Sequence, residues 1–161
     1  MTQTFITSIA RIADFDKNPY DVRMLEQSLW ESGDYVRTEV TGTRTVLYAI
    51  ESCTGEMVPV QPGDQVIGAL GHREATLEVV RCYLDVKHGK MHALTSAGLL
   101  VVFTSFLTLL PRPFSLCYRG HIVRDNRKIT MRQFAVRCDE GSFKVPTILI
   151  IGTSYSAEDI G

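Results

Sequence analysis

Between Asp34 and Leu84 the chain consists of short runs in which apolar and polar residues alternate. In the first run, Val36 and Val40 fall on one side and Arg37 on the other. Alternation with a period of two predicts half-buried β-strands, and the sequences between the runs are rich in turn-forming residues. The expected strands are Asp34–Thr41, Arg44–Glu51, Met57–Val60, Gln65–Leu70 and Glu74–Leu84, separated by turns at Gly42–Thr43, Cys53–Glu56, Pro62–Asp64 and Gly71–Arg73. Five short strands at this spacing predict a curled antiparallel sheet or a small barrel.

One helix is expected before these strands, from Asn18 to Gly33. Asn18 suits the N-cap, Pro19 suits the first helical position, and Gly33 suits the C-terminal end. The apolar residues of this segment recur at spacings of three and four, and they are Val22, Leu25 and Leu29, with Trp30 beside them. We expect this stripe to pack on the sheet.

The second half of the chain predicts further strands. Residues 91–105 are compatible with either a short helix or a buried strand. Phe114–Val123 and Lys128–Val136 are typical of a hairpin turning at Asp125-Asn126. The expected fold class is therefore mainly β (α+β): a small curled antiparallel sheet or barrel with one N-terminal helix and a C-terminal hairpin.

The last segment, 147–161, begins in the manner of a phosphate-binding P-loop. The apolar run Thr147–Ile151 ends in Gly152, Thr153 and Ser154, as a strand does before such a loop. However, Glu158 stands where the P-loop lysine belongs and Asp159 where the Ser or Thr belongs. A carboxylate there would repel a phosphate, so we interpret the motif as degenerate. An all-apolar strand favours cover on both faces, which leads us to expect self-association of the chain.

Net charge, cysteine spacing and the length of the apolar runs limit the class of protein that the sequence can encode. The chain has 161 residues and a formal net charge of −1, so no overall charge favours nucleic acid or anionic lipid. Its four cysteines show no Cys-x-x-Cys spacing and are expected to be reduced. The N-terminus does not resemble a signal peptide, and the longest apolar run, 98–110, is too short to span a bilayer. We expect a cytoplasmic protein with no membrane association.

The most basic part of the chain is the expected C-terminal hairpin. Its candidate ligand-binding residues are Arg119, His121, Arg124, Arg127 and Lys128, with Arg132 and Arg137 nearby. Such a face could bind the phosphates of a nucleotide or a nucleic acid. Alternatively, outward Arg and Lys residues protect the edge of a strand.

A second cluster of candidate ligand-binding residues lies at Gly68–Thr76. His72, Arg73 and Thr76 could contact an anion beside two glycines, although a turn explains the same residues. His88 and His92 are four residues apart, but Gly89 interrupts them and no third ligand follows. We therefore expect no metal, no cofactor and no catalytic residue.

Four segments in this order resemble a known group of proteins: Pro62–Glu78, Met91–Leu99, Tyr118–Asp125 and Ile148–Ser154. They are similar to uncharacterised prokaryotic proteins in which a β-rich N-terminal domain precedes a P-loop nucleotide-binding domain. The nucleotide-binding domain of that group looks like the one in molybdopterin-guanine-dinucleotide biosynthesis accessory proteins. The resemblance implies a β-rich accessory domain at 1–146, followed at 147–161 by a remnant of the first strand and turn of a P-loop domain.

The sequence therefore leads to a ranked set of functional hypotheses. The first is a non-enzymatic accessory or regulatory domain of a P-loop-type protein, which binds a partner domain, a second copy or a small ligand. The alternative is a β-barrel that binds nucleotides or nucleic acid through the basic hairpin. A third hypothesis is a small hydrolase or transferase that uses His72 or His121.

Overall fold

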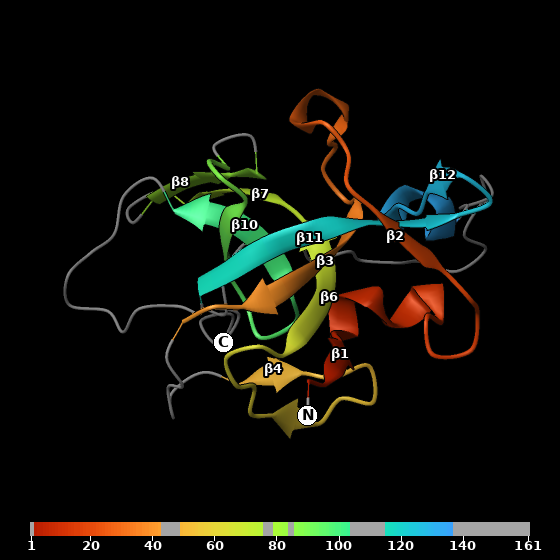
Figure 1. Cartoon of the computed structure of the whole chain (residues 1–161), viewed down its shortest axis with the longest axis horizontal. Helices are drawn as coiled ribbons and strands as arrows, with labels where there is room; N and C mark the ends of the chain where they lie inside the picture. Colours follow the sequence, from red (N-terminus) through yellow and green to blue (C-terminus); the bar gives the residue numbers. More distant parts are fainter. Residues whose placement is uncertain (1, 43–48, 76–78, 84–85, 104–114, 137–161) are drawn as a thin grey trace, which may run out of the picture.

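The computed structural model describes residues 2–42, 49–75, 79–83, 86–103 and 115–136 of the chain (Figure 1). Strands are the main secondary structure of these residues, as expected. The strands are β1 (Thr4–Ile6), β2 (Asp21–Arg23), β3 (Tyr35–Val40), β4 (Ile50–Glu51), β5 (Met57–Val58), β6 (Gln65–Leu70), β7 (His72–Ala75), β8 (Val79–Cys82), β9 (Lys90–Ala93), β10 (Leu99–Phe103), β11 (Ser115–Arg124) and β12 (Arg127–Lys128). The described helical segments are the 3-10 turns η1 (Ser8–Ala13), η2 (Gln27–Leu29) and η4 (Met131–Phe134).

Five of the strands close into a barrel in the order β6–β3–β11–β9–β10, and β10 then pairs with β6. Figure 1 shows β11 crossing the barrel beside β3. The pairings are antiparallel except between β10 and β6. A ring with an odd number of strands needs one such parallel pair, because strand direction cannot alternate all the way round. The expected small barrel is therefore confirmed, with one parallel seam.

The parallel seam is shared by two strands that follow each other along one edge of β6. β1 pairs with residues 65–67 of β6, and β10 pairs with residues 69 and 70. At the junction, the Thr7 N–H donates to the Ile67 carbonyl at 3.1 Å and the Ala69 N–H donates to the Gly98 carbonyl at 3.0 Å. Gly98 has a φ of +94°, and a Cβ there would collide with Thr7, so this position requires glycine.

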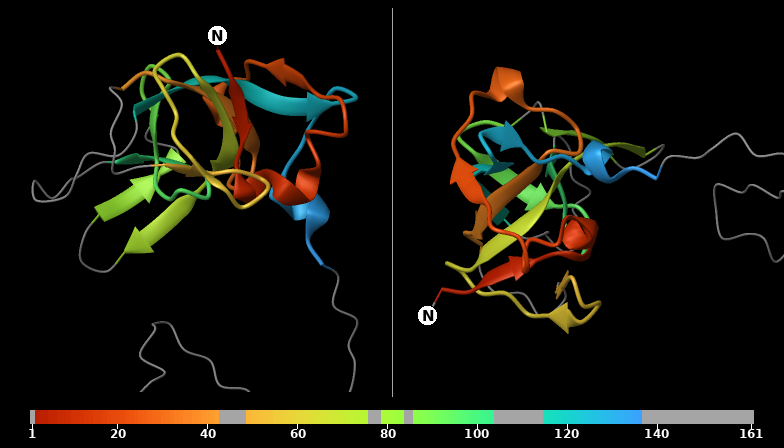
Figure 2. Two further views of the ribbon diagram at one scale, coloured as in Figure 1. Left: turned by 90° about the horizontal axis from the view of Figure 1, so that it is seen from below. Right: turned by 90° about the vertical axis from the view of Figure 1, so that its right-hand side faces the viewer.

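Apolar side chains form two clusters, one inside the barrel and one outside it. The inner cluster includes Val36, Val66, Leu100 and Leu116, and Trp30 caps it. The outer cluster is covered by η1 and η4, which lie side by side outside the barrel (Figure 2). Its members are Ala10, Ala13, Phe15, Tyr35, Ile67, Ala69, Ile122 and Ile129. The middle strands are therefore covered on both faces, which explains why residues 66–70 are all buried.

The helix expected from Asn18 to Gly33 is wrong. The segment forms β2, which pairs antiparallel with β11, and then the short turn η2. Val22 is not part of a helical stripe, because it packs against Gly120 of β11. Leu29 is 55% exposed. Pairing with β11 outweighs the weak local preference for helix.

Several other element boundaries also differ from those expected. His72 and Arg73 lie in β7 rather than in a turn, and the strand expected at Glu74–Leu84 is instead the antiparallel pair β7 and β8. The ambiguous segment 91–105 resolves into strands where it is described. The turn at Asp125-Asn126 is confirmed, since both residues have positive φ values of 49° and 63°.

The hairpin that turns at Asp125-Asn126 is shorter than expected. Its second strand, β12, ends at Lys128, and η4 replaces the remainder of the strand expected at Lys128–Val136. Thr130 forms a capping box with Gln133 at the start of η4. The C-terminal hairpin itself is confirmed.

Candidate functional site

A network of polar side chains lies buried where β11, β12 and the start of β3 meet. Nδ1 of His121 is 2.6 Å from the Tyr118 hydroxyl oxygen, and its Nε2 is 3.1 Å from Oδ2 of Asp34. Nζ of Lys128 donates to the same Oδ2 at 2.9 Å. The side chains of Asp34 and His121 are 0% exposed. We call Tyr118, His121, Asp34 and Lys128 the buried network.

A bulge in β11 brings the two ring-bearing members of this network to one side of the strand. Tyr118 and His121 are three residues apart, so strict alternation would place them on opposite faces. The register with β3 shifts between Tyr118 and Gly120, which adds one residue to β11. Gly120 has a φ of +142°, and a Cβ there would lie 2.6 Å from Val22. Both side chains therefore point inward.

The buried network holds the segment 24–31 against the barrel. Lys128 donates to the Leu29 carbonyl at 2.7 Å and to the Glu31 carboxylate at 2.9 Å. The Leu25 N–H donates to the Tyr118 hydroxyl at 3.3 Å. The segment is thus tied down near both of its ends.

Electrostatics keep this network charged. Burial alone would raise the pKa of the Asp34 carboxyl, but hydrogen bonds from His121, Lys128 and the Glu31 N–H hold that pKa below its ordinary value. Burial alone would lower the pKa of the Lys128 ammonium, but hydrogen bonds to Asp34 and Glu31 hold it above its ordinary value. Asp34 is therefore a carboxylate and Lys128 an ammonium at neutral pH.

The buried network contains the residue types of a proton relay, but its side chains are not accessible to a substrate. A general base must reach the proton that it abstracts. Both ring nitrogens of His121 already have partners, and Tyr118 is only 5% exposed. Burial also raises the pKa of the Tyr118 hydroxyl. The geometry therefore fits a clamp that fixes segment 24–31.

Beside this clamp, a hollow of about 370 Å³ opens at one end of the barrel. We call it the barrel mouth. Leu25 and Trp30 from segment 24–31 line it, with His88 and Gly89 from the turn between β8 and β9 and Arg119 from β11. Figure 1 shows segment 24–31 projecting beyond β11. Met24 in the same segment is 68% exposed.

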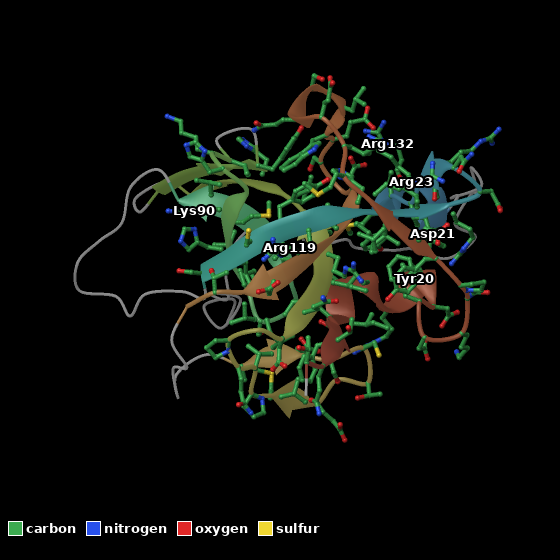
Figure 3. The ribbon with its side chains drawn as sticks, in the orientation of Figure 1. Tyr20, Asp21, Arg23, Lys90, Arg119 and Arg132 are labelled. Atoms are coloured by element: carbon green, nitrogen blue, oxygen red, sulfur yellow. The ribbon has the colours of Figure 1, made fainter. Side chains whose placement is uncertain are left out.

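The basic residues predicted on the hairpin have separate environments. Arg119 Nε donates to Glu39 at 2.9 Å, and Arg124 Nε donates to the Pro19 carbonyl at 3.1 Å. His121 and Lys128 belong to the buried network. Arg127 is exposed at the hairpin tip, where it lines a hollow of about 330 Å³ with Arg124 and Lys128. Arg132 lies in η4, which follows the hairpin (Figure 3).

The other predicted residues are not brought together with the hairpin. His72 is exposed on β7, and Arg73 follows it in the same strand. Thr76 lies outside the described residues, as do Gly152, Thr153, Ser154 and the strand expected at 147–151. The P-loop remnant and the self-association expected from that strand therefore stay predictions.

Neither a metal centre nor a membrane-spanning helix is found in the part of the chain that the structure describes. There, no group of three or more His, Cys, Asp or Glu side chains could hold a metal ion. No helix among those residues is long and apolar enough to cross a bilayer. Cys53 and Cys117 are free and half-buried.

Sequence reasoning missed Asp34, Tyr118 and the barrel mouth as parts of a site. Their partners lie up to 94 residues apart in the chain, so no local spacing connects them. Gly120 is the one local signal, because a glycine inside a strand pattern indicates a bulge. Read in that way, it would have placed Tyr118 and His121 on one face.

Comparison of the chain with protein-family models, with curated proteins and with solved structures found no match. The chain's own geometry is therefore what supports a function.

Proposed function

We propose that the chain is a non-enzymatic accessory module that binds a partner through segment 24–31. One observation carries the proposal. Tyr118, His121 and Asp34 are residue types that could do chemistry, but their hydrogen bonds hold this segment in place. The same segment exposes apolar side chains, with Met24 68% and Leu29 55% exposed. Exposed apolar residues on a fixed projection are typical of a protein interface.

The kind of partner follows from the resemblance seen in the sequence. An N-terminal domain of a P-loop-type protein would contact a nucleotide-binding domain or a second copy of itself. Hollows on either side of segment 24–31 support this use, because one is lined by Met24 and Leu25 and the other by Leu29 and Glu31. A partner's side chains could enter both hollows.

A binding experiment with matched variants tests this proposal. Proteins that co-purify with the chain would be identified, purified and titrated against it by calorimetry. We expect Met24→Asp/Leu29→Asp to weaken binding at least about tenfold, because two apolar contacts become charged. Ile12→Asp is the control, since Ile12 is equally exposed at 55% but lies in η1. Equal weakening by both variants would contradict the proposal.

A turnover assay tests the non-enzymatic part of the proposal. With magnesium and ATP or GTP, we expect no hydrolysis above the uncatalysed rate, because Glu158 replaces the P-loop lysine. Hydrolysis that is lost on changing Gly152 would contradict it.

The alternative function, binding of a nucleic acid or nucleotide by the hairpin, is favoured by the hollow at its tip. Arg124, Arg127 and Lys128 line that hollow. Titration with single-stranded and duplex oligonucleotides at two salt concentrations tests it. Binding that weakens with salt and is lost in Arg127→Ala would favour this alternative. An absence of binding at low salt would contradict it.

A further inference from the structure

We propose that the barrel mouth is a binding site for a small aromatic anion, meaning a flat ring that carries a phosphate or carboxylate. The inference rests on the proposed function, because it names a ligand class for the same binding module. It is carried by the apolar side chains that line this hollow, by Arg119 in the same lining and by Lys90, which pairs in register with the lining residue Cys117.

The wall of the barrel mouth accepts an apolar group. Trp30 and Tyr118 pack together with ring centroids 4.4 Å apart. Their polar atoms are already used, since Trp30 Nε1 donates to the Leu25 carbonyl at 3.1 Å and the Tyr118 hydroxyl is bound by His121 and Leu25. A polar group pushed against this wall would lose its hydrogen bonds to water, so the entering part of a ligand should be apolar.

The size and the side chains of the hollow favour a ring. A volume of about 370 Å³ is at the small end of the range for small-molecule sites. Met24 also lines the hollow, and a methionine adapts its shape to a ring and makes favourable sulfur–aromatic contacts. Aromatic groups pack well beside Trp and Tyr rings.

The rim of the barrel mouth is cationic. Lys90 pairs in register with Cys117, which lines the hollow, so both side chains lie on one face of the neighbouring strands. Lys90 is the first residue of β9 and Arg119 lies in β11; both residues are labelled in Figure 3. Lys87 is exposed in the adjoining turn. Within the described residues, neither Lys87 nor Lys90 forms an ion pair.

Arg119 adds donors to this rim. Its Nε is held by Glu39, which orients the guanidinium, and its other nitrogens make no hydrogen bond within the described residues. A guanidinium has five N–H donors in a planar fork that matches phosphate and carboxylate. His88 also lines the rim. Among the described residues, Glu26 adjoins the lining residue Leu25, and Glu39 is paired with Arg119.

A titration of the whole chain with four probes tests the inference. The probes are phenyl phosphate, AMP, adenosine and inorganic phosphate, and the readouts are Trp30 fluorescence and backbone amide shifts. We expect phenyl phosphate to bind and to shift the amides of Leu25, His88 and Gly89. Adenosine and inorganic phosphate should bind at least about tenfold more weakly, because each lacks one half of the ligand. AMP binding as tight as that of phenyl phosphate would extend the class to nucleotides.

Variants locate the binding site. Lys90→Glu should weaken phenyl phosphate binding about tenfold, and Met24→Asp should weaken it similarly, because both place negative charge at the barrel mouth. Both side chains are exposed, so these variants should fold. Arg127→Glu is the matched control, since it removes an exposed cation at the hairpin tip and should leave binding unchanged.

Three outcomes would overturn the inference. They are an absence of saturable phenyl phosphate binding, equally tight binding of adenosine, and loss of binding in Arg127→Glu but not in Lys90→Glu. The first of these outcomes could occur together with a purified partner that binds through Met24 and Leu29. That combination would leave the proposed function standing.

Discussion

At the scale of single residues, the structure depends on the hydrogen bonds that the buried Asp34 carboxylate accepts. Oδ2 of this carboxylate accepts hydrogen bonds from the Glu31 N–H at 2.9 Å and from Lys128 at 2.9 Å, and it also contacts His121. Oδ1 is buried and has no partner among the described residues. A buried carboxylate with one unsatisfied oxygen is tolerated because its other oxygen is strongly paired.

Removing Lys128 should therefore be costly. Lys128→Met keeps most of the unbranched side chain but leaves Asp34 without its cation, and we expect a loss of about 2 to 3 kcal/mol in the free energy of unfolding. This value lies at the low end for a buried pair because the Lys128 side chain is 24% exposed. Urea unfolding followed by Trp30 fluorescence measures the loss.

The control for Lys128→Met is Lys90→Met, which removes an exposed lysine and should change stability by about 0.5 kcal/mol or less. Lys128→Met should also cost less in an Asp34→Asn background, because the two residues interact. Equal costs in both backgrounds would show that the pair does not matter.

Acid should weaken the same interaction. The pKa of Asp34 is lowered in the folded chain, so its contribution is complete above the unfolded pKa of about 4 and is lost as the pH falls through the folded pKa. The difference in unfolding free energy between the wild type and Asp34→Asn should be constant above about pH 5 and should shrink as the pH falls from about 4 through the folded pKa of Asp34. Urea unfolding at several pH values measures it, and a difference that does not shrink in acid would contradict the account.

At the scale of elements, the alternation of residues predicted strands well and the helical stripe predicted badly. β3 and β6 lie within one residue of the expected bounds, because their apolar residues and the turn-forming residues beside them are visible in the local sequence. β2 depends on a partner 100 residues later in the chain, which no local pattern can reveal. The buried network was unpredictable for the same reason, since the bulge at Gly120 reverses the side on which His121 lies.

Gly120 should be intolerant of any side chain. In Gly120→Ala the Cβ would lie 2.6 Å from Val22 and 2.9 Å from the Arg23 carbonyl oxygen, so β2 must shift. We expect a loss of about 2 kcal/mol or more in unfolding free energy, measured by urea unfolding.

Gly63→Ala is the matched control for this position. Gly63 has a φ of +92°, but nothing lies within 4 Å of an added Cβ. We expect it to cost about 1 kcal/mol, from backbone strain alone. Equal costs at the two glycines would indicate that the contact between β2 and the bulge is unimportant.

At the scale of the whole molecule, a closed barrel supplies a rigid frame and segment 24–31 supplies a fixed surface on it. The ring β6–β3–β11–β9–β10 has apolar cover inside and, over β3, β6 and part of β11, outside as well. The buried network connects that frame to the segment. The central claim is therefore that the network acts as a clamp and that binding occurs on the surface it holds.

Hydrogen exchange at backbone amides in Lys128→Met tests this claim most directly. If the network is a clamp, the amides of Leu25 and Glu31 should exchange at least about tenfold faster than in the wild type, while those in the middle of β3 and β6 keep their protection. Unchanged exchange in segment 24–31, or a uniform increase across the barrel, would contradict the claim.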